Sequence, residues 1–340
     1  MLGVVLMNMG GPDSIEAVEP FLRNLFADRD LIKLPWGGLG QGALARFIAG
    51  RRAPKVRELY RSIGGRSPIG ELTERQTRGL EAALRDGGLD CRCYVAMRYW
   101  KPFADDAARA LRSDGVVRVL ALTLYPQFSD STTGSSLKDL RRALAAAGVR
   151  APLDAIDRYG DDDAYLDALA EAVTAGLAEI PAAERERVPV LFSAHGLPQR
   201  YVDRGDPYER EVRATVAGVV ARLGLGDRWR LGFQSKVGPV KWLGPSTEVV
   251  IHDLARQGAR ALLVVPVAFV SDHIETLQEI DLRYRDVAHA AGITEFRRAP
   301  ALNDRPAFIA ALAGLVRRHL DARAPGAASP RAAGPPGSRA

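Results

Sequence analysis

Six short runs of mainly apolar residues alternate with amphipathic stretches, and this alternation constrains the fold more than any other feature of the sequence. The runs span residues 3–9, 94–98, 119–125, 188–193, 231–234 and 261–267. Strands separated by helices predict parallel sheets, because a parallel crossover needs a helix-sized connection. We therefore expect an α/β protein of two Rossmann-like, doubly wound domains, each with a parallel sheet flanked by helices, and a cleft between them. The expected boundaries are residues 1–150 for the first domain, 151–322 for the second and 323–340 for a disordered tail, which is rich in Ala, Pro, Gly and Ser.

The composition is that of a soluble globular protein: 47% of the 340 residues are apolar and 26% are charged. No apolar run approaches the roughly 20 residues of a spanning helix, and no signal-peptide pattern begins the chain, so we expect a cytoplasmic protein. Five arginines and one aspartate from residue 317 onward carry four of the six net positive charges, so the remainder is too weakly basic to indicate nucleic acid binding. Two cysteines, Cys91 and Cys93, cannot supply the four thiolates of an all-cysteine iron–sulfur cluster.

Residues suited to chemistry gather in the loops that follow the predicted strands. In open parallel sheets, ligands bind beyond the carboxyl ends of the strands. The loops in question are NMGGP, YPQFSDSTTGSS, SAHGLP, QSKVGP and VSDHIETLQE. The third carries His195, one of five histidines, directly after a buried-looking strand. Such a histidine is either structural or, because its pKa lies near neutrality, a base suited to proton abstraction at pH 7.

A row of acidic side chains is expected on a helix that begins near Asp272. At about 100° per residue, one face of this helix carries Asp272, Glu275, Thr276, Glu279 and Arg283. Asp272 and Glu275 fit a capped helix N-terminus, but a cap needs only one carboxylate, and Glu275 repels Glu279 at i, i+4. The row therefore indicates either a cap or a path for a cation or for protons.

Residues 46–66 contain seven basic side chains and a single acid, Glu58, and apolar residues with a GGLGQG segment precede them. Charge runs are usually solvated faces. Apolar residues next to a cluster of basic residues also suit a lip that rests on an anionic membrane, or a pocket for a flat apolar ligand with carboxylates.

The glycine-rich NMGGP and TTGSS segments are interpreted as tight turns. The sequence has neither GxGxxG nor GxxxxGK[ST], and this argues against nucleotide binding.

Taken together, the motifs resemble the ferrochelatase family from residue 3 to about residue 320. In chain order they are NMGGP, FLRNLFADRDLIKLP, IGGRSPI, STTGSSL, SAHGLP, RGDPY, QSKVGPVKWLGP and SDHIETLQEID. The resemblance implies a class II chelatase-like fold. It also implies a lyase that inserts Fe2+ into protoporphyrin IX, with release of two pyrrole protons, as the terminal step of haem biosynthesis.

The resemblance also implies roles for individual residues. His195 matches the family's essential histidine, regarded either as acceptor of pyrrole protons or as a metal ligand, and Glu275 is expected to be catalytic with it. The implied metal-binding residues are His195, Glu275, Asp272 and Glu279. The implied substrate-binding residues are Met9, Arg52, Lys55, Tyr60, Ser67, Arg98, Tyr99, Ser235, Trp242, Phe269 and His273. The implied lip covers about residues 20–50, with Leu25, Phe26, Leu31 and Ile32.

Two departures from the family pattern stand out. Gly196 replaces the serine that commonly follows the histidine, an exchange expected to loosen the turn. Family members with an iron–sulfur cluster have a cysteine in the STTGSS loop, where this chain has Asp130, and a cysteine-rich C-terminus, which this chain lacks. We therefore expect an enzyme without such a cluster, with ferrous iron as its substrate.

Several alternatives stay open. The apolar lip favours protoporphyrin over coproporphyrin, whose four carboxylates are costly to bury, but a coproporphyrin ferrochelatase is the main alternative. A chelatase that loads another divalent metal into an earlier tetrapyrrole and a non-enzymatic haem carrier are further ones. Peripheral contact with the inner face of the cell membrane fits the lip, and the oligomeric state, monomer or homodimer, cannot be read from the sequence.

Overall fold

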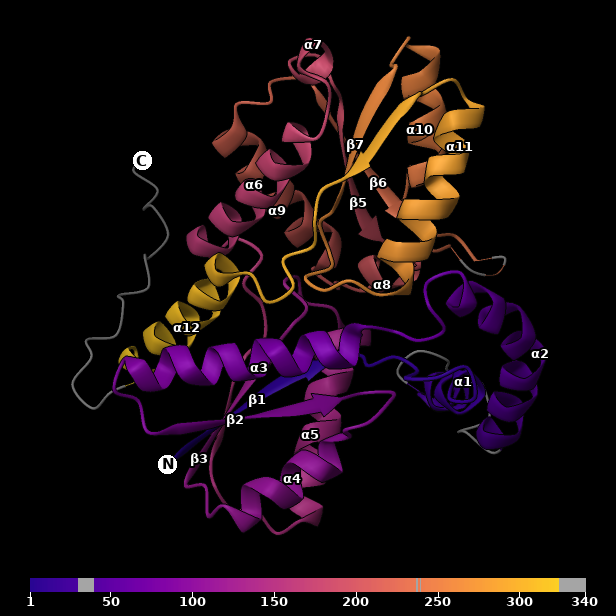
Figure 1. The fold of residues 1–340 in the computed structure, drawn as a ribbon. Helices are drawn as coiled ribbons and strands as arrows, with labels where there is room; N and C mark the ends of the chain where they lie inside the picture. The colour runs from indigo at the N-terminus through magenta and orange to yellow at the C-terminus, as the bar shows by residue number, and fades with distance from the viewer. Residues whose placement is uncertain (30–39, 237, 239, 324–340) are drawn as a thin grey trace, which may run out of the picture.

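The computed structural model describes residues 1–29, 40–236, 238 and 240–323, and each half of this part contains a four-stranded sheet. In the N-terminal half the order is β2-β1-β3-β4, formed by β1 (Leu2–Asn8), β2 (Cys91–Met97), β3 (Arg118–Thr123) and β4 (Leu153–Ile156). In the C-terminal half the order is β6-β5-β7-β8, formed by β5 (Val190–His195), β6 (Trp229–Gln234), β7 (Ala261–Pro266) and β8 (Glu295–Arg298). Neighbouring strands are parallel in both sheets, which confirms the predicted fold class (Figure 1).

The apolar runs form strands that are buried on both faces. In β1, Val4 and Leu6 belong to one hydrophobic cluster and Val5 and Met7 to another, because successive side chains of a strand point to opposite faces. In the N-terminal half, the second cluster is covered by α4 (Ala104–Ser113) and α5 (Ser135–Ala146). Helices on both faces are what all-parallel sheets require.

The C-terminal sheet is covered in the same way. Helices α10 (Thr247–Arg256) and α11 (Arg285–Ala290) pack on one face, and α6 (Asp163–Ala178) and α9 (Tyr208–Leu223) on the other. The remaining helices are α1 (Val18–Ala27), α2 (Gln41–Arg61), α3 (Ile69–Asp86), α7 (Ala182–Arg185), α8 (Gln199–Val202), α12 (Pro306–Asp321) and two π-helical segments, η1 (Asp130–Gly134) and η2 (Glu275–Tyr284).

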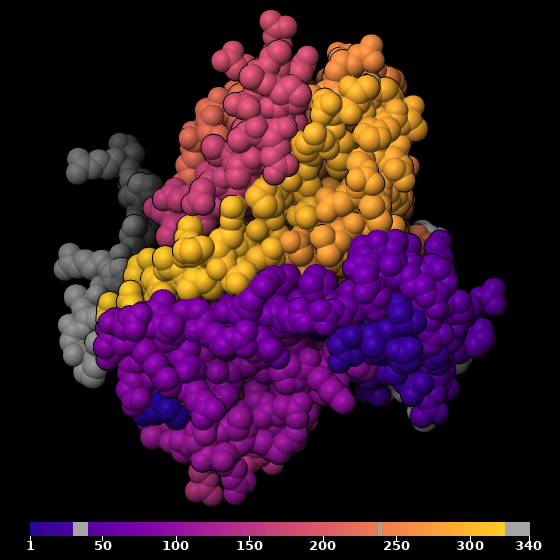
Figure 2. All heavy atoms as spheres, in the orientation of Figure 1, coloured from indigo at the N-terminus to yellow at the C-terminus, as the bar shows by residue number. Residues whose placement is uncertain are grey.

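The last helix joins the two halves. Phe308 and Leu312 of α12 share one hydrophobic cluster with Leu80 and Leu84 of α3, and the Phe308 ring lies 6.4 Å from that of Tyr165 in α6. Figure 2 shows the yellow spheres of α12 lying between the upper half and the purple spheres of α3. Because this core is shared, the domain boundary at residue 150 stays a prediction.

Helices α1 and α2 extend from the side of the N-terminal half, next to the junction (Figure 1). Phe21 and Leu22 of α1 pack with Ala49 and Ala53 of α2. The predicted lip residues Leu31 and Ile32 lie outside the described residues, as do residues 324–340 of the predicted tail. In the part of the chain that is described, no helix is long and apolar enough to span a bilayer.

Candidate active site

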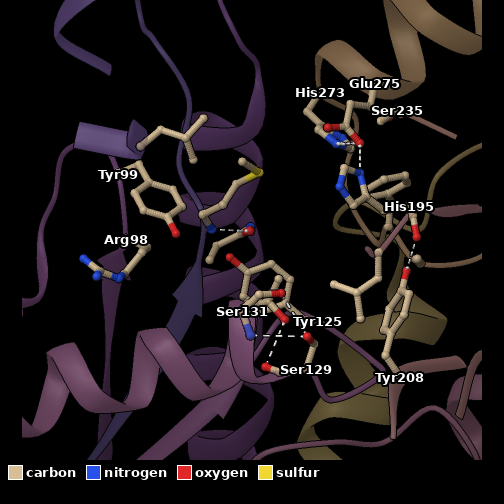
Figure 3. A pocket seen from close by; sticks show the side chains of 18 of the residues that line it. Arg98, Tyr99, Tyr125, Ser129, Ser131, His195, Tyr208, Ser235, His273 and Glu275 are labelled. Atoms are coloured by element: carbon tan, nitrogen blue, oxygen red, sulfur yellow. Dashed lines mark hydrogen bonds and ion pairs between the residues drawn. The ribbon is translucent and has the colours of Figure 1, made fainter. Parts of the chain in front are cut away.

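A cavity of about 570 Å3 lies between the two halves, with walls from both (Figure 3). All five loops singled out in the sequence contribute to it, at the carboxyl ends of β1, β3, β5, β6 and β7. The parallel sheets place these loops at one junction even though they are far apart in the chain. The loops therefore meet beyond the strand ends, as expected, and the chemistry assigned to them stays a prediction.

His195 is the last residue of β5 and faces the cavity. Its Nδ1 lies 2.8 Å from Oε2 of Glu275, and 40% of its side chain is exposed to the cavity. Burial lowers the pKa of the imidazole, but the carboxylate and hydrogen bond of Glu275, helped by Glu279, outweigh this and raise the pKa above its ordinary value. The Tyr208 hydroxyl donates to the His195 backbone carbonyl at 2.9 Å.

Glu275 is the first residue of η2 and is ionised at neutral pH. Burial raises the pKa of its carboxyl group, but His195 and His273 more than offset this and lower the pKa to about 2. The Gln234 side chain donates to the Glu275 backbone carbonyl at 3.1 Å, which fixes the start of η2 against the end of β6. The pair of His195 and Glu275 can thus accept a proton and stabilise the resulting imidazolium.

His273 lies behind this pair and is buried. Its Nε2 is 3.9 Å from Oε2 of Glu275, and its Nδ1 is 3.0 Å from the Ser271 carbonyl, to which Nδ1–H donates. Burial lowers the pKa of His273, although the charge of Glu275 opposes this. The Phe269 ring stacks edge-on against it with centroids 4.5 Å apart.

The acidic row does not lie along one α-helical face, because the segment is a π-helix that begins at Glu275. Apolar periodicity alone cannot distinguish i→i+5 from i→i+4 hydrogen bonding. Asp272 lies before η2, and its carboxylate is bound by Arg298 at 3.0 Å, by the Asn303 amide at 2.8 Å and by the Thr276 hydroxyl at 3.0 Å.

Glu279 accepts hydrogen bonds from Ser235, Gln234 and Tyr284 and pairs with Arg283. Neither Asp272 nor Glu279 lines the cavity. In the described residues, no three His, Cys, Asp or Glu side chains converge on a preformed metal site. The four predicted metal-binding side chains are therefore divided into one close pair and two residues held by other partners.

Most of the predicted substrate-binding residues line the cavity: Met9, Arg52, Arg98, Tyr99, Ser235, Trp242, Phe269 and His273, together with the lip residues Leu25 and Phe26. Lys55, Tyr60 and Ser67 are not among the lining residues. Tyr60 and Ser67 are buried, and burial together with the Glu275 charge raises the pKa of Tyr60.

A buried carboxylate that sequence reasoning missed holds two of these residues. Asp28 follows α1, and its side chain is only 2% exposed. It accepts hydrogen bonds from the Tyr99 and Ser135 hydroxyls, both at 2.8 Å, and pairs with Arg98 at 2.9 Å. The charge of Arg98 is thus compensated within the protein, whereas Arg52 makes a cation–π contact with Phe26 at 5.6 Å.

Further cavity residues were not singled out from the sequence: Asn8, Tyr125, Gln127, Ser129, Ser131, Arg200 and Tyr208. Their loops were predicted to hold the site, but no sequence pattern singled out these residues.

The turn at Gly196 also differs from expectation. A Cβ there would lie 2.7 Å from the Gln234 carbonyl and 3.2 Å from the Trp242 ring, so the glycine allows close packing rather than a loose turn.

Known proteins resemble this chain over nearly its whole length. A family model described as Ferrochelatase matches residues 1–320. The protein named Ferrochelatase from Geotalea daltonii is 53% identical over 314 residues, which cover 92% of this chain and 96% of that one. The protein of the same name from Synechococcus sp. (strain JA-3-3Ab) is 49% identical over 328 residues, covering 95% of each. The solved structure of SirB from Bacillus subtilis with Fe3+ has a TM-score of 0.54 at 11% identity, covers 93% of this chain and 94% of that one, and shows similarity of fold alone.

Proposed function

Because the chain belongs to the ferrochelatase family, we propose that the porphyrin into which it inserts Fe2+ is protoporphyrin IX, at the last step of haem biosynthesis. The single observation that carries the catalytic assignment is the 2.8 Å contact between His195 and Glu275 on the wall of a cavity lined by both halves. The chain is a lyase of the metal-inserting kind, as its relatives are named.

The barrier to metal insertion comes from the porphyrin itself. The ring is flat and rigid, and two inward N–H groups block the metal. We assign His195 as acceptor of the pyrrole protons, because an unprotonated imidazole with a raised pKa is a good base near neutrality. Glu275 stabilises the imidazolium that forms, and walls from both halves can bend the ring, with binding energy from its faces offsetting the strain.

Ferrous iron enters as a substrate, so its ligands must release it. Nitrogen and carboxylate oxygen ligands suit Fe2+ without holding it irreversibly. We assign this role to Glu275, because His195 uses its free ring nitrogen to accept the pyrrole protons. Glu279 assists proton exit through the hydrogen bond that it accepts from the Ser235 hydroxyl. Asp272 is assigned to positioning the start of η2, since its carboxylate is bound by Arg298 and Asn303.

The cavity walls support a flat apolar ligand. Met9, Trp242 and Phe269 offer apolar surface, and Leu25 and Phe26 of the lip extend it. Arg52 is assigned to the propionates, whereas the Ser235 hydroxyl donates to Glu279. The vinyl groups of protoporphyrin fit this apolar lining better than the additional carboxylates of coproporphyrin would.

One observation favours coproporphyrin as the second candidate. Arg200 of α8, in the C-terminal half, also lines the cavity, as Arg52 of α2 does in the N-terminal half, and in the described residues neither guanidinium forms an ion pair. One cation from each half can meet carboxylates at separate points of the ring. Anaerobic insertion assays with both porphyrins separate the two candidates: kcat/KM should be higher for protoporphyrin, and a preference for coproporphyrin would overturn the proposal.

The catalytic assignment has its own test. His195→Ala and Glu275→Gln should each lose nearly all iron insertion while the protein still binds porphyrin, measured by quenching of its tryptophan fluorescence. Near-normal turnover in the alanine variant would refute the role of His195. Porphyrin binding lost together with activity would instead show that the residue holds the substrate.

Three further expectations belong to this proposal. The enzyme needs no iron–sulfur cluster, and the purified protein should contain no acid-labile sulfide; Cys91 and Cys93 are buried in β2.

We also propose a cytoplasmic protein that contacts an anionic membrane surface through α2, where Phe47 is 67% exposed among Arg46, Arg51 and Lys55. Co-sedimentation with anionic but not neutral vesicles would support this contact.

A further inference from the structure

One face of α9 is packed along the loop that follows β3, in the other half of the molecule. Gln127 Nε2 donates to Thr215 Oγ1 at 3.0 Å, and the Phe128 backbone N–H donates to Glu211 Oε2 at 2.7 Å. Residues 208, 211 and 215 are three and four positions apart and so share one side of the helix. The loop on one wall of the cavity is thus fixed to α9, the second helix after the His195 turn.

Asp206, which lies just before α9, links the same two segments through a buried carboxylate. Its Oδ2 accepts from the Ser129 hydroxyl and from the Asp130 backbone N–H, both at 2.9 Å. Its Oδ1 accepts from the Tyr208 backbone N–H at 3.0 Å. Removing this carboxylate would take a partner from two buried donors, the Ser129 hydroxyl and the Tyr208 N–H, and from the part-buried Asp130 N–H, which is costly where water cannot replace it.

Tyr208 continues the connection to the imidazole. Its backbone N–H is held by Asp206, and its hydroxyl donates to the His195 carbonyl at 2.9 Å. Figure 3 shows Ser129 and Tyr208 along the lower side of the cavity, with the Tyr208 side chain reaching up to the backbone of His195. The contacts therefore run without a break from Ser129 in the N-terminal half to His195 in the C-terminal half.

We propose that Asp206 and Tyr208 of the RGDPY segment are positioning residues that fix the His195 imidazole relative to the opposite wall of the cavity. This inference rests on the proposed role of His195 as proton acceptor. A porphyrin bound between the walls presents its pyrrole N–H groups at a fixed place, so proton transfer requires His195 to stay within hydrogen-bond reach of that place. Loosening the connection slows the transfer without releasing the porphyrin.

Two variants test the connection at its two ends. Tyr208→Phe removes only the hydroxyl and should lower kcat for iron insertion about tenfold, the value of one hydrogen bond, with the porphyrin KM unchanged within about twofold. Asp206→Asn keeps the shape of the side chain but offers one acceptor oxygen instead of two, so one backbone N–H faces an amide donor. We expect a larger loss of kcat, again with porphyrin still bound.

Ser129 supplies a milder variant and a rescue. Ser129→Ala removes one of the two donors to Oδ2 and should lower kcat less than Asp206→Asn, and Ser129→Thr, which keeps a hydroxyl, should restore it. Tyr94→Phe is the matched control, since it deletes a tyrosine hydrogen bond of 2.7 Å to Asp114 outside the cavity. It should leave kcat at the wild-type value.

The outcomes are distinct. The inference is wrong if the kcat of Tyr208→Phe stays within twofold of the wild-type value. It is also wrong if the Tyr208, Asp206 and Ser129 variants change only the porphyrin KM and the thermal stability and leave kcat unchanged. If His195→Ala is inactive while Tyr208→Phe keeps the wild-type kcat, only the positioning role is wrong. His195→Ala that retains insertion overturns the role of His195 itself. Should Asp206→Asn fail to fold, the tyrosine and serine variants still decide the matter.

Discussion

Replacing Glu275 with glutamine should move the acid limb of the insertion activity to lower pH. Burial lowers the pKa of His195, and Glu275 and Glu279 together raise it above its ordinary value. Without the Glu275 charge, burial is opposed by Glu279 alone, so the pKa of His195 falls. Since the imidazole must be unprotonated to accept a pyrrole proton, the rate should decline at a lower pH than in the wild type.

The structure also gives the size of the effect on the plateau rate. The pKa of the Glu275 carboxyl group falls from an ordinary value of 4.5 to about 2, mainly because of His195, even though burial opposes this. That net shift corresponds to about 3 kcal/mol by which the surroundings favour the ionised over the neutral carboxyl group, after burial has opposed it. The part that comes from His195 also stabilises the imidazolium formed on proton transfer, so its loss should lower the plateau kcat by about 100-fold.

The assay is the initial rate of anaerobic Fe2+ insertion over roughly pH 5.5 to 8.5, the range in which a histidine titrates. Asp253→Asn is a matched control, because it removes a carboxylate that pairs with Arg256 on the outer surface. The control should leave both the limb and the plateau in place. If Glu275→Gln shifts neither of them, Glu275 does not set the basicity of His195 and the reasoning fails.

Two further predictions concern residues around the site, and a third concerns the hydrophobic core. Asp28→Asn should raise the porphyrin KM about five- to tenfold with little change in kcat, because Arg98 and Tyr99 lose their shared anchor; steady-state kinetics check this. Arg298→Met should destabilise the fold by about 3 kcal/mol in urea unfolding, since it leaves Asp272 and Asp281 without their buried cation, and a loss below about 1 kcal/mol would contradict this. Leu80→Ala, at a fully buried position of α3, should cost about 3 kcal/mol in the same measurement, whereas Val249→Ala, at a position 49% exposed, should cost less than about 0.5 kcal/mol.

The sequence predicted the parts of the fold that apolar burial determines. Six strands were found because residues such as those of β1 and β7 are buried on both faces and so form continuous apolar runs. β4 and β8 were missed, because each has only four residues, lies at the edge of its sheet and is half-buried. The location of the site followed from the same logic, since parallel strands bring His195 and Glu275 together although 80 residues separate them.

The details of the site depend on contacts that leave no local pattern. Asp28 meets Ser135 across 107 positions, and Asp206 meets Ser129 across 77, so neither carboxylate could be given a partner from the sequence. The π-helical form of η2 was missed for another reason: the spacing of its apolar residues fits an α-helix as well. This difference separated Asp272 from the row of acids on which the sequence reasoning had placed it.

The start of η2 explains how the proposed catalytic pair of His195 and Glu275 is held in place. Glu275 is the first π-helical residue, and Asp272, bound by Arg298 and Asn303, fixes the chain just before it. On the other side of the contact, the backbone of His195 is fixed by β5 and by the Tyr208 hydroxyl. Each backbone is thus held by residues other than the pair itself, while His273 adds a contact of 3.9 Å to the Glu275 carboxylate. In the proposed mechanism this leaves the imidazole available to protons and the carboxylate to iron, because Asp272 and the Tyr208 hydroxyl are already bound to other groups.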